Sequence, residues 1–381
     1  MNRRVIIIGA GISGMSIAYH LAKKGVKDIR VIDKGYFTSG ATGRCGAGVR
    51  SQWATPINCL LAKKSIEFFE KANEILEYDK DVEFKQEGYL ILATTQEEDQ
   101  QFKSNVKLQN SLGIPSVYLS KEEALKIVPH LNPESFISAS FCHKDGHLNP
   151  FKMTEAFMRA AKKLGVTFGY YEEVLDIIVE KNIIKGVKTI KHDYLCDIVI
   201  NAAGGYSKEI GLMAGIDIPV YSENHEILAT EPIDKIQGPM VMSFSKNIYC
   251  QQLPHGAFLM GRSDPNVVKG HQTNSTWQFL DEIANTIDDI MPKLGDLKIV
   301  RQWGGSYNMS YDRQPIISKV ESLEGFYIAC GFSGHGFMLA PMTGLLLSEI
   351  ILNEPTTLDV SSLDLKRFKD FETLIIEQSV V

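Results

Sequence analysis

A glycine-rich stretch near the start of this 381-residue chain constrains its fold more than any other feature. Residues 9–14 read G-A-G-I-S-G, a G-x-G-x-x-G pattern, and they follow the apolar run 5–8. A short, uninterrupted apolar run predicts a strand that is buried on both faces. Apolar residues then recur at helical spacing over residues 12–22, and Gly25 ends that pattern. The stretch therefore predicts a strand, a tight glycine turn and a helix that begins at the turn.

A second predicted strand, residues 29–32, completes a β-α-β unit and ends at Asp33. The right-handed crossover makes the two strands parallel neighbours. This arrangement directs the free N–H groups of the first helical turn at a pyrophosphate, and it places Asp33 where a ribose hydroxyl can donate to it. We therefore expect a dinucleotide site that includes Gly9, Gly11, Ile12, Ser13, Gly14, Asp33 and Lys34.

Two further glycine-rich loops favour FAD over NAD as the dinucleotide. Residues 39–43, S-G-A-T-G, follow the second strand directly, where an NAD-binding domain usually continues into its next helix. Residues 331–336, G-F-S-G-H-G, precede a predicted helix whose N-terminal dipole would stabilise the anionic edge of a reduced flavin. From these loops and their flanks we expect cofactor contacts from Ser39, Ala41, Thr42, Arg44, Cys45, Gly46, Gly331, Ser333, Gly334, His335, Gly336, Phe337 and Met338.

Segments of the nucleotide-binding type lie at the start, middle and end of the chain. In the middle, the predicted buried strand 195–201 runs into Ala202, Ala203 and Gly204, which we expect at the cofactor together with Val174. The sequence thus predicts a two-domain α/β (α+β) protein. Its discontinuous Rossmann-like FAD-binding domain comprises residues 1–84, 141–217 and 319–381, and its inserted antiparallel-sheet substrate domain comprises residues 85–140 and 218–318.

Periodicity outside the glycine loops predicts further elements of both domains. Amphipathic spacing predicts one long helix over residues 57–78 and another over residues 151–164. A predicted strand, 326–330, leads into the last glycine loop, and a helix follows that loop through Leu352. Extended segments are predicted at residues 88–92, 226–230, 247–252 and 257–261.

Composition excludes several classes of function. The formal net charge is −6 and no basic stripe is evident, which argues against nucleic acid as a partner. The six cysteines are scattered without a C-x-x-C pair, a pattern typical of reduced thiols rather than of a disulfide framework or a metal site. No run of 18 apolar residues occurs, so we expect no transmembrane segment and a cytoplasmic location.

Several motifs together resemble those of the D-amino-acid oxidase/sarcosine oxidase superfamily of FAD enzymes, over essentially the whole chain. Besides the first glycine motif they are residues 145–150 (D-G-H-L-N-P), 201–204 (N-A-A-G), 312–315 (D-R-Q-P) and 331–336. Residues 44–50 (R-C-G-A-G-V-R) and 333–341 (S-G-H-G-F-M-L-A-P) most resemble the β subunits of heteromeric L-proline dehydrogenases, with sarcosine oxidase β subunits and glycine oxidase nearby. The resemblance implies a glutathione-reductase-type FAD fold. It also implies a dehydrogenase that oxidises a secondary amino acid such as proline or sarcosine: hydride passes to flavin N5 and leaves an imine that hydrolyses, and the electrons go on to a partner or an acceptor other than oxygen.

The same resemblance implies four substrate-site residues. Arg50 falls where the sarcosine oxidase family places its carboxylate-binding arginine, and a guanidinium can hold a carboxylate through two hydrogen bonds. Tyr249 and Tyr307 match aromatic positions that wall the substrate side of the flavin, and His225 would place an imidazole near the amine. Each has a structural alternative: a surface or phosphate-facing arginine, core or interface tyrosines, and a structural histidine.

Departures from the family pattern also carry predictions. Gly305 stands where monomeric sarcosine oxidases attach FAD through a cysteine, so we expect non-covalent FAD. Leu259 stands where those oxidases carry a lysine that promotes reaction with oxygen, which favours a dehydrogenase. Met338 replaces a second carboxylate-binding lysine. Two interpretations of Cys45 stay open: a thiol of lowered pKa, or a small residue needed where backbone approaches the flavin. For His335 we expect a structural hydrogen bond to the flavin or the backbone.

The resemblance finally raises the question of partners. A second flavin, FMN, at a subunit interface would relay electrons, together with an α-type redox subunit or a second copy of the chain. The sequence has no second nucleotide fingerprint and no iron–sulfur cysteine cluster. Three alternatives stay open: a stand-alone glycine, sarcosine or D-amino-acid oxidase that makes hydrogen peroxide; the same fold acting on a 2-hydroxy acid or polyol phosphate; and a flavin-bearing electron-transfer or structural subunit.

Overall fold

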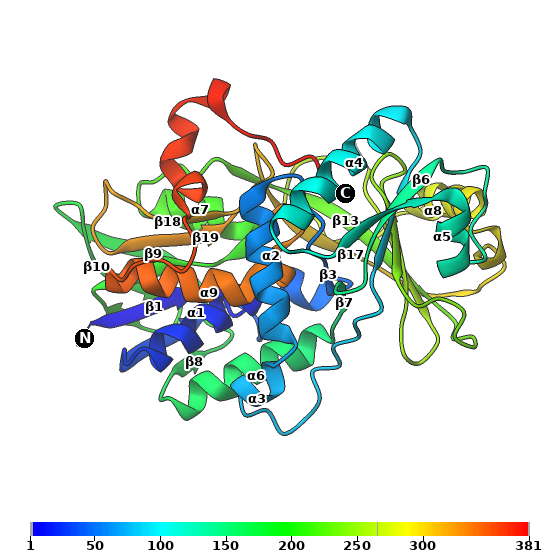
Figure 1. The fold of residues 1–381 in the computed structure, drawn as a ribbon. Helices are drawn as coiled ribbons and strands as arrows, with labels where there is room; N and C mark the ends of the chain where they lie inside the picture. Colours follow the sequence, from blue (N-terminus) through cyan, green and yellow to red (C-terminus); the bar gives the residue numbers. More distant parts are fainter. Residues whose placement is uncertain (1–2, 265, 380–381) are drawn as a thin grey trace.

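The computed structural model describes residues 3–264 and 266–379, and a six-stranded sheet forms its first layer. The strand order is β18-β19-β12-β1-β2-β8 (Figure 1). All neighbours are parallel except β18 and β19. The bounds are β1 (Arg4–Ile8), β2 (Asp28–Ile32), β8 (Thr167–Gly169), β12 (Ile198–Asn201), β18 (Ile316–Lys319) and β19 (Phe326–Cys330).

Helices cover one face of this sheet. Helix α9 packs on α1 and α2, and α6 packs on α1 (Figure 1). Their buried side chains, such as Met15, Phe157 and Leu339, share one apolar core with Ile7 of β1. The bounds are α1 (Ile12–Lys23), α2 (Pro56–Phe69), α3 (Ala72–Ile75), α6 (Pro150–Lys163) and α9 (Gly336–Leu352).

A second apolar cluster covers the other side of the same sheet. It includes Ile6 and Ile8 of β1 and Val187 of a small antiparallel sheet with the order β11-β10-β9. The bounds are β9 (Val174–Glu180), β10 (Ile183–Thr189), β11 (Asp193–Leu195) and α7 (Ser207–Met213), with short 3-10 helices η1 (Ala41–Arg44), η2 (Gly204–Tyr206), η4 (Ser361–Leu363), η5 (Leu365–Lys369) and η6 (Phe371–Thr373).

An eight-stranded sheet, β17-β13-β16-β15-β14-β4-β6-β5, forms the other half of the molecule. All its neighbours are antiparallel except β14 and β4, so the sheet is mixed. The bounds are β4 (Tyr89–Ala93), β5 (Ser116–Ser120), β6 (Ser138–Cys142), β13 (Val220–Thr230), β14 (Met240–Ser243), β15 (Ile248–Gln252), β16 (Phe258–Arg262), β17 (Ile299–Ser310), α4 (Gln96–Ser111), α5 (Lys121–Ile127), α8 (Trp277–Ile290) and η3 (Pro292–Leu294). A two-stranded ribbon, β3 (Gly48–Val49) and β7 (Gly146–His147), lies in the connecting segments.

The predicted fold class is confirmed, and so is the opening β-α-β unit. The prediction of a single helix over residues 57–78 is wrong, because α2 ends at Phe69 and α3 begins at Ala72. Between them the chain makes a turn, with a hydrogen bond from Lys71 N–H to the Phe68 carbonyl. Helix α8 was not predicted. The predicted strand 195–201 is two strands, β11 and β12. The domain division stays a prediction; β6 and β18 cross its limits at 140/141 and 318/319.

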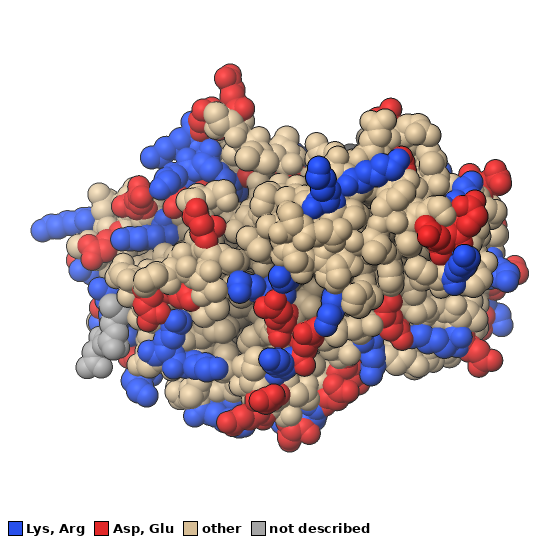
Figure 2. Space-filling view, in the orientation of Figure 1, with Lys and Arg blue, Asp and Glu red and all other residues tan. Residues whose placement is uncertain are grey.

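Neither the surface charges nor the thiols of the described residues show an unusual arrangement. Figure 2 shows basic and acidic side chains intermingled over the face drawn in Figure 1. All six cysteines, each within the described part of the chain, are free thiols. Among residues 3–264 and 266–379, no helix has both the length and the apolar character needed to cross a membrane.

Candidate active site

The turn between β1 and α1 requires glycine for two physical reasons. Gly9 has φ +115°, a conformation that L side chains rarely adopt, and a Cβ there would lie 2.2 Å from the Ala202 carbonyl oxygen. A Cβ on Gly14 would lie 2.0 Å from the Gly9 carbonyl oxygen. The close contacts therefore bring the predicted residues Ala202 and Ala203, which follow β12, directly against the first glycine turn.

The N-terminus of α1 is open to an anion. No described side chain caps Gly11 at this end, and the first turn carries no acidic residue. The Asp33 carboxylate accepts hydrogen bonds from Ala10 N–H and Gly35 N–H, both at 2.7 Å, which fixes it at the end of β2 beside the turn. Thr42 Oγ1 accepts from Ile12 N–H at 3.1 Å and draws the second loop to the same place. A helix end whose first turn holds no acid, beside a fixed carboxylate, suits the pyrophosphate and ribose of FAD.

Other predicted cofactor residues lie around this turn with varied surroundings. The Lys34 ammonium lies 3.2 Å from the ring centre of Tyr206, in the segment that begins with Gly204. Ser39 lines a cavity described below, and Ala41 begins η1. Val174 is buried in the apolar cluster that also contains Ile8, so its role there is packing as well.

The second open helix end belongs to α9 and lies at the other end of the predicted cofactor path. His335 occupies the N-cap position, no described side chain caps it, and the first turn has no acid. Asn308 shapes the loop: its Oδ1 accepts from Gly331 N–H at 2.5 Å, and its carbonyl accepts from Ser333 N–H at 2.8 Å. Burial lowers the pKa of His335 to about 3, so its imidazole is neutral at physiological pH.

A small cavity of about 70 Å³ lies between this loop and the eight-stranded sheet. Residues from six separate segments line it: Cys45, Gly46, Ala47, Gly48, Arg50, Trp53, Tyr89, Met240, Met242, Tyr249, Tyr307, Ser333, Gly334, His335, Phe337 and Met338. Burial raises the pKa of the Cys45 thiol to about 11, so the expectation of a lowered pKa is wrong and the reading as a small residue remains. Two hydrogen bonds fix residues 44–46 in the wall of the cavity. Arg44 Nη1 donates to the Gly304 carbonyl at 2.9 Å, and Gln251 Nε2 donates to the Gly46 carbonyl at 2.7 Å.

Arg50 provides the positive charge of this cavity. It follows β3 directly, and its side chain is 3% exposed. Nη1 donates to the Gln52 carbonyl at 2.6 Å, Nη2 donates to the Ser379 carbonyl, and Nε has no partner among the described residues. The guanidinium carbon lies 3.6 Å from the ring centre of Trp53. A buried cation that retains an unused donor is suited to binding a carboxylate.

The two tyrosines line the cavity, whereas the histidine lies behind one of them. Burial raises the pKa of Tyr307 to about 12 and that of Tyr249 well above its ordinary value, so both phenols stay protonated. His225 stacks on the Tyr307 ring at 3.7 Å between centres, and its Nδ1 lies 2.9 Å from Ser263 Oγ. Among the described residues that line the cavity, His225 is not included. His225 thus contacts Tyr307, and its role near the amine stays a prediction.

Two buried acids near Arg50 were not predicted as site residues. Asp145 is fully buried and accepts hydrogen bonds from Ser51 N–H at 2.8 Å, Ser51 Oγ at 2.6 Å and Gln52 Nε2 at 3.0 Å. Burial raises its pKa to about 6, while these bonds and the Arg50 charge oppose that rise. Its signal was present in the D-G-x-x-x-P motif. The second acid, Glu377, carries no motif.

A larger cavity of about 430 Å³ lies on the other side of the segment Arg44–Gly46. Its lining includes the aromatic residues Tyr36, Phe151 and Trp303, the guanidinium groups of Arg44 and Arg301, the imidazoles of His147 and His255, the carboxylate of Glu83 and the apolar Leu259. Burial lowers the pKa of His147 to about 4, so this imidazole adds no positive charge at physiological pH. Cys45 and Gly46 line both cavities. The chain therefore forms two adjacent cavities that share a wall.

The comparison with known proteins agrees with this geometry. The sequence model of the FAD dependent oxidoreductase (DAO) family matches residues 4–350. The chain belongs to this family. It is an FAD-dependent oxidoreductase, and its two uncapped helix ends, with Asp33 between them in sequence, are the features that suit this cofactor.

Individual relatives span nearly the whole chain of this oxidoreductase. The sarcosine oxidase β subunit of Rhodobacter capsulatus is 27% identical over 381 residues, which covers 99% of this chain and 90% of the relative. The crystal structure of L-proline dehydrogenase from P. horikoshii superposes with a TM-score of 0.90 at 38% identity and covers 97% of this chain and 98% of that one. Glycine oxidase from Geobacillus kaustophilus, with a TM-score of 0.87 at 22% identity over 96% and 99% of the two chains, supports the fold alone.

Proposed function

We propose that this oxidoreductase is an amino-acid dehydrogenase whose substrate is a secondary amino acid such as proline or sarcosine. The observation that carries the proposal is the buried Arg50 guanidinium, with an unused Nε–H, in a cavity walled by Tyr249 and Tyr307. The likeness to a sarcosine oxidase β subunit and to an L-proline dehydrogenase supports the same substrate class. Bound FAD would supply the hydride acceptor, N5.

The chain's own residues would bind and orient the amino acid. Arg50 holds the substrate carboxylate by charge-assisted hydrogen bonds, which fixes the position of the carbon that loses hydride. The neutral phenols of Tyr249 and Tyr307 present aromatic walls and O–H donors without adding negative charge. The fixed Arg50 cation and the low polarity of the walls disfavour a substrate ammonium, so the reactive neutral amine is favoured. The product would be an imine.

The acceptor of the electrons is proposed to be other than oxygen. Leu259 lines the larger cavity and carries no charge, so it offers no electrostatic stabilisation to superoxide. Gly305 has no side chain for covalent attachment, and a Cβ there would lie 3.1 Å from Arg44 Cβ; we therefore propose non-covalent FAD. A stand-alone oxidase is the alternative, and it would release hydrogen peroxide in air.

The larger cavity is our proposed site for a second flavin, FMN. Its basic residues suit a phosphate, and its aromatic residues suit an isoalloxazine ring. Since only the segment around Cys45 and Gly46 separates the two cavities, electrons would pass a short way between the flavins. The likeness to a sarcosine oxidase β subunit supports a redox partner chain, or a second copy of this chain, and we place the enzyme in the cytoplasm. Extraction of the native complex and chromatography of its flavins test this: equal amounts of FMN and FAD are expected, and FAD alone would contradict it.

Anaerobic mixing of the purified enzyme with amino acids tests the donor. Proline or sarcosine is expected to bleach the visible absorbance of the oxidised flavin, whereas failure with every amine would overturn the proposal and leave an electron-transfer subunit. Rapid peroxide formation in air would instead indicate the oxidase.

Replacing Arg50 gives the first prediction. We expect Arg50→Ala to raise KM about 100-fold, because a buried charge-assisted pair contributes roughly 3 kcal/mol, and to leave the FAD content unchanged. Steady-state kinetics and flavin content measure this, with the surface variant Arg159→Ala as the control. Loss of FAD from Arg50→Ala would assign this residue to the cofactor instead.

A further inference from the structure

The segment after α9 returns from the edge of the FAD-binding sheet to the cavity. It leaves α9 at Leu352, passes through η4, η5 and η6, and continues as extended chain over residues 374–379. In Figure 1 this red segment rises beyond α9 and comes back across the molecule towards α2. Two sets of polar contacts hold the returning part in place.

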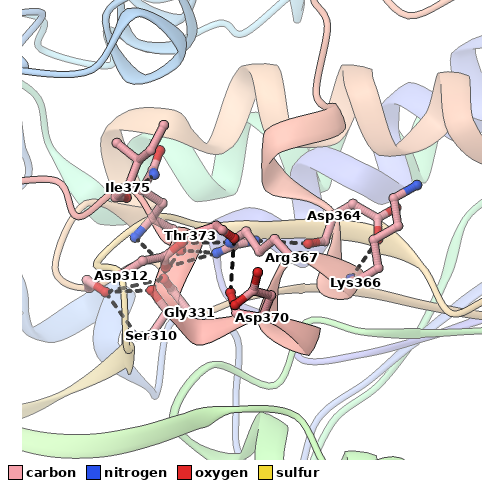
Figure 3. Close-up of polar contacts among 11 residues, drawn as sticks. Ser310, Asp312, Gly331, Asp364, Lys366, Arg367, Asp370, Thr373 and Ile375 are labelled. Atoms are coloured by element: carbon pink, nitrogen blue, oxygen red, sulfur yellow. Dashed lines mark hydrogen bonds and ion pairs between the residues drawn. The ribbon is translucent and has the colours of Figure 1, made fainter.

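The first set lies at the turn after β17. The Arg367 guanidinium donates to the buried Asp312 carboxylate at 2.7 and 3.1 Å and to the Gln314 carbonyl at 2.9 Å (Figure 3). The Gln314 side chain donates to the Ile375 carbonyl at 2.6 Å, and Glu377 N–H donates to the Asp312 carbonyl at 3.0 Å. Side chain and backbone together therefore fix both the start and the direction of the extended residues.

The second set lies at the N-terminus of α2. The fully buried Glu377 carboxylate accepts from Ala54 N–H at 3.0 Å, from Thr55 N–H at 3.1 Å and Oγ1–H at 2.6 Å, and from Asn58 Nδ2 at 3.0 Å. Burial opposes the charged form, but these hydrogen bonds outweigh it and hold the pKa of Glu377 below its usual range. The helix end adds a favourable field for the carboxylate. Glu377 is thus satisfied as an anion without a direct bond to Arg50.

The consequence reaches Arg50 through Ser379, which lies two residues beyond Glu377 in the segment. Glu377 Oε1 accepts from Ser379 N–H at 3.0 Å, and the Ser379 carbonyl accepts from Arg50 Nη2. Nη1 is likewise held by a carbonyl, that of Gln52. Both ligands are neutral, so they orient the guanidinium without forming an ion pair with it, and the nearby Glu377 and Asp145 carboxylates act on its charge through space. An acid in either place would have competed with a substrate carboxylate.

We infer that residues 374–379 are part of the carboxylate-binding site, and that Glu377 is a positioning residue that sets the Ser379 carbonyl against Arg50. The inference rests on the proposed function and extends it. The segment acts on substrate binding and makes no contact with the reacting bond. Release of the segment should therefore raise KM for an amino acid and leave kcat nearly unchanged.

Kinetics with a matched pair of substrates test the inference. In Glu377→Ala, KM for L-proline is expected to rise about 10-fold, whereas KM for L-prolinamide, which lacks the carboxylate, should hardly change. Glu377→Gln should fall between wild type and Glu377→Ala, because it keeps an acceptor and loses the charge. In an Arg50→Ala background, Glu377→Ala should add nothing. The control is Glu372→Ala, which removes an exposed acid from the part of the chain between α9 and residues 374–379.

A second measurement does not depend on activity. Arg50→Ala should speed amide hydrogen exchange at residues 377–379 in the resting enzyme, while Arg159→Ala should not. Two results would overturn this inference and leave the proposed function standing. One is a KM for L-proline in Glu377→Ala equal to that of wild type, and the other is an amide exchange rate at residues 377–379 that Arg50→Ala does not change. Tetrahydrofuran-2-carboxylate is an analogue of proline with oxygen in place of the amine, so it can bind but cannot be oxidised to an imine. If no amino acid bleaches the wild-type flavin and this analogue leaves the flavin spectrum unchanged, the proposed function fails, and the role of residues 374–379 in substrate binding fails with it.

Discussion

The N-termini of α1 and α2 meet the same physical requirement in opposite ways. Each presents unpaired N–H groups and a positive dipole end. At α1 the first turn is free of acids and the neutral Thr42 Oγ1 accepts from Ile12 N–H, while the Asp33 carboxylate bonds only as far as Ala10 N–H, before the N-cap residue Gly11. At α2 the N-cap residue Thr55 makes no capping bond of its own, and the Glu377 carboxylate, 322 residues away in sequence, takes its place.

The difference separates a binding end from a structural end. A terminus with no carboxylate bonded to its N-cap N–H, as in α1 and α9, leaves donors available to an anion that comes from outside the chain. A terminus whose N-cap N–H is paired with an internal carboxylate, as in α2, fixes two distant segments to each other instead. The absence of a carboxylate on the N-cap N–H is therefore as informative for cofactor binding as the presence of glycine.

The largest expected effect comes from adding an acid to the open end of α1. Ser13→Asp should weaken FAD binding about 100-fold or more, because a carboxylate close to the pyrophosphate repels it in a site of reduced dielectric. The apoprotein should become slightly more stable, by about 0.3–1 kcal/mol, since the same charge favours the helix dipole. Titration of apoprotein with FAD and urea unfolding of the apoprotein measure the two effects.

The neutral variant Ser13→Asn is the control for that experiment, because it is of similar size. It should bind FAD nearly as well as wild type. Equal affinities of the Asp and Asn variants for FAD would place the pyrophosphate away from α1.

A smaller effect is expected from removing the Glu377 carboxylate from the N-terminus of α2. Glu377→Ala should lower the free energy of unfolding by about 2–3 kcal/mol, since it strips hydrogen bonds from a buried charge and leaves their donors unpaired. Thr95→Ala removes an ordinary local cap, at α4, and should cost about 1 kcal/mol. Urea unfolding followed by circular dichroism compares the two variants. Equal losses in the free energy of unfolding would mean that the distant Glu377 carboxylate stabilises the protein no more than an ordinary local cap does.

The smallest effect concerns the pH dependence of the α1 region. Burial lowers the pKa of His20 from 6.5 to about 3, so the unfolded chain takes up a proton in this range and the native protein does not. Stability from this residue is complete above pH 6.5 and is lost as pH falls, by about 1.4 kcal/mol per pH unit.

His20→Phe tests this, because the ring packs among Tyr19, Phe68 and Phe157 and an aromatic replacement fits that setting. The variant should show a shallower loss of stability between pH 6.5 and 5 than wild type. Replacing the exposed His143 by Phe should leave the pH slope unchanged. An unchanged slope in His20→Phe would show that this histidine is protonated in the native state.

The sequence was most informative where the structural signals are local. Strand, glycine turn, helix and Asp33 lie within residues 5–33, so spacing alone predicted the β-α-β unit. Helix α8 also had a local signal that went unused: Thr276 caps it, and Phe279, Ile283 and Ile287 are buried at helical spacing.

Other features depend on contacts between distant residues and could not be predicted from spacing. Apolar Ala72 and Leu76 continue the periodicity of α2 and are buried in the shared core, yet the chain turns between Phe69 and Ala72. Glu377 resembles any surface glutamate until Thr55 and Asn58 surround it. His225 matched a family position, but its place behind Tyr307 depends on how β13 pairs with β17.

The shared wall between the two cavities has a consequence for variation among such enzymes. Cys45 and Gly46 face the smaller cavity and the larger one, and the Gly46 carbonyl is tied to Gln251. Under the function proposed above, in which the smaller cavity binds the amino acid and the larger one the second flavin, a substitution at either residue would alter both sites together. Changes confined to one of the two sites would then have to come from residues that line only that cavity.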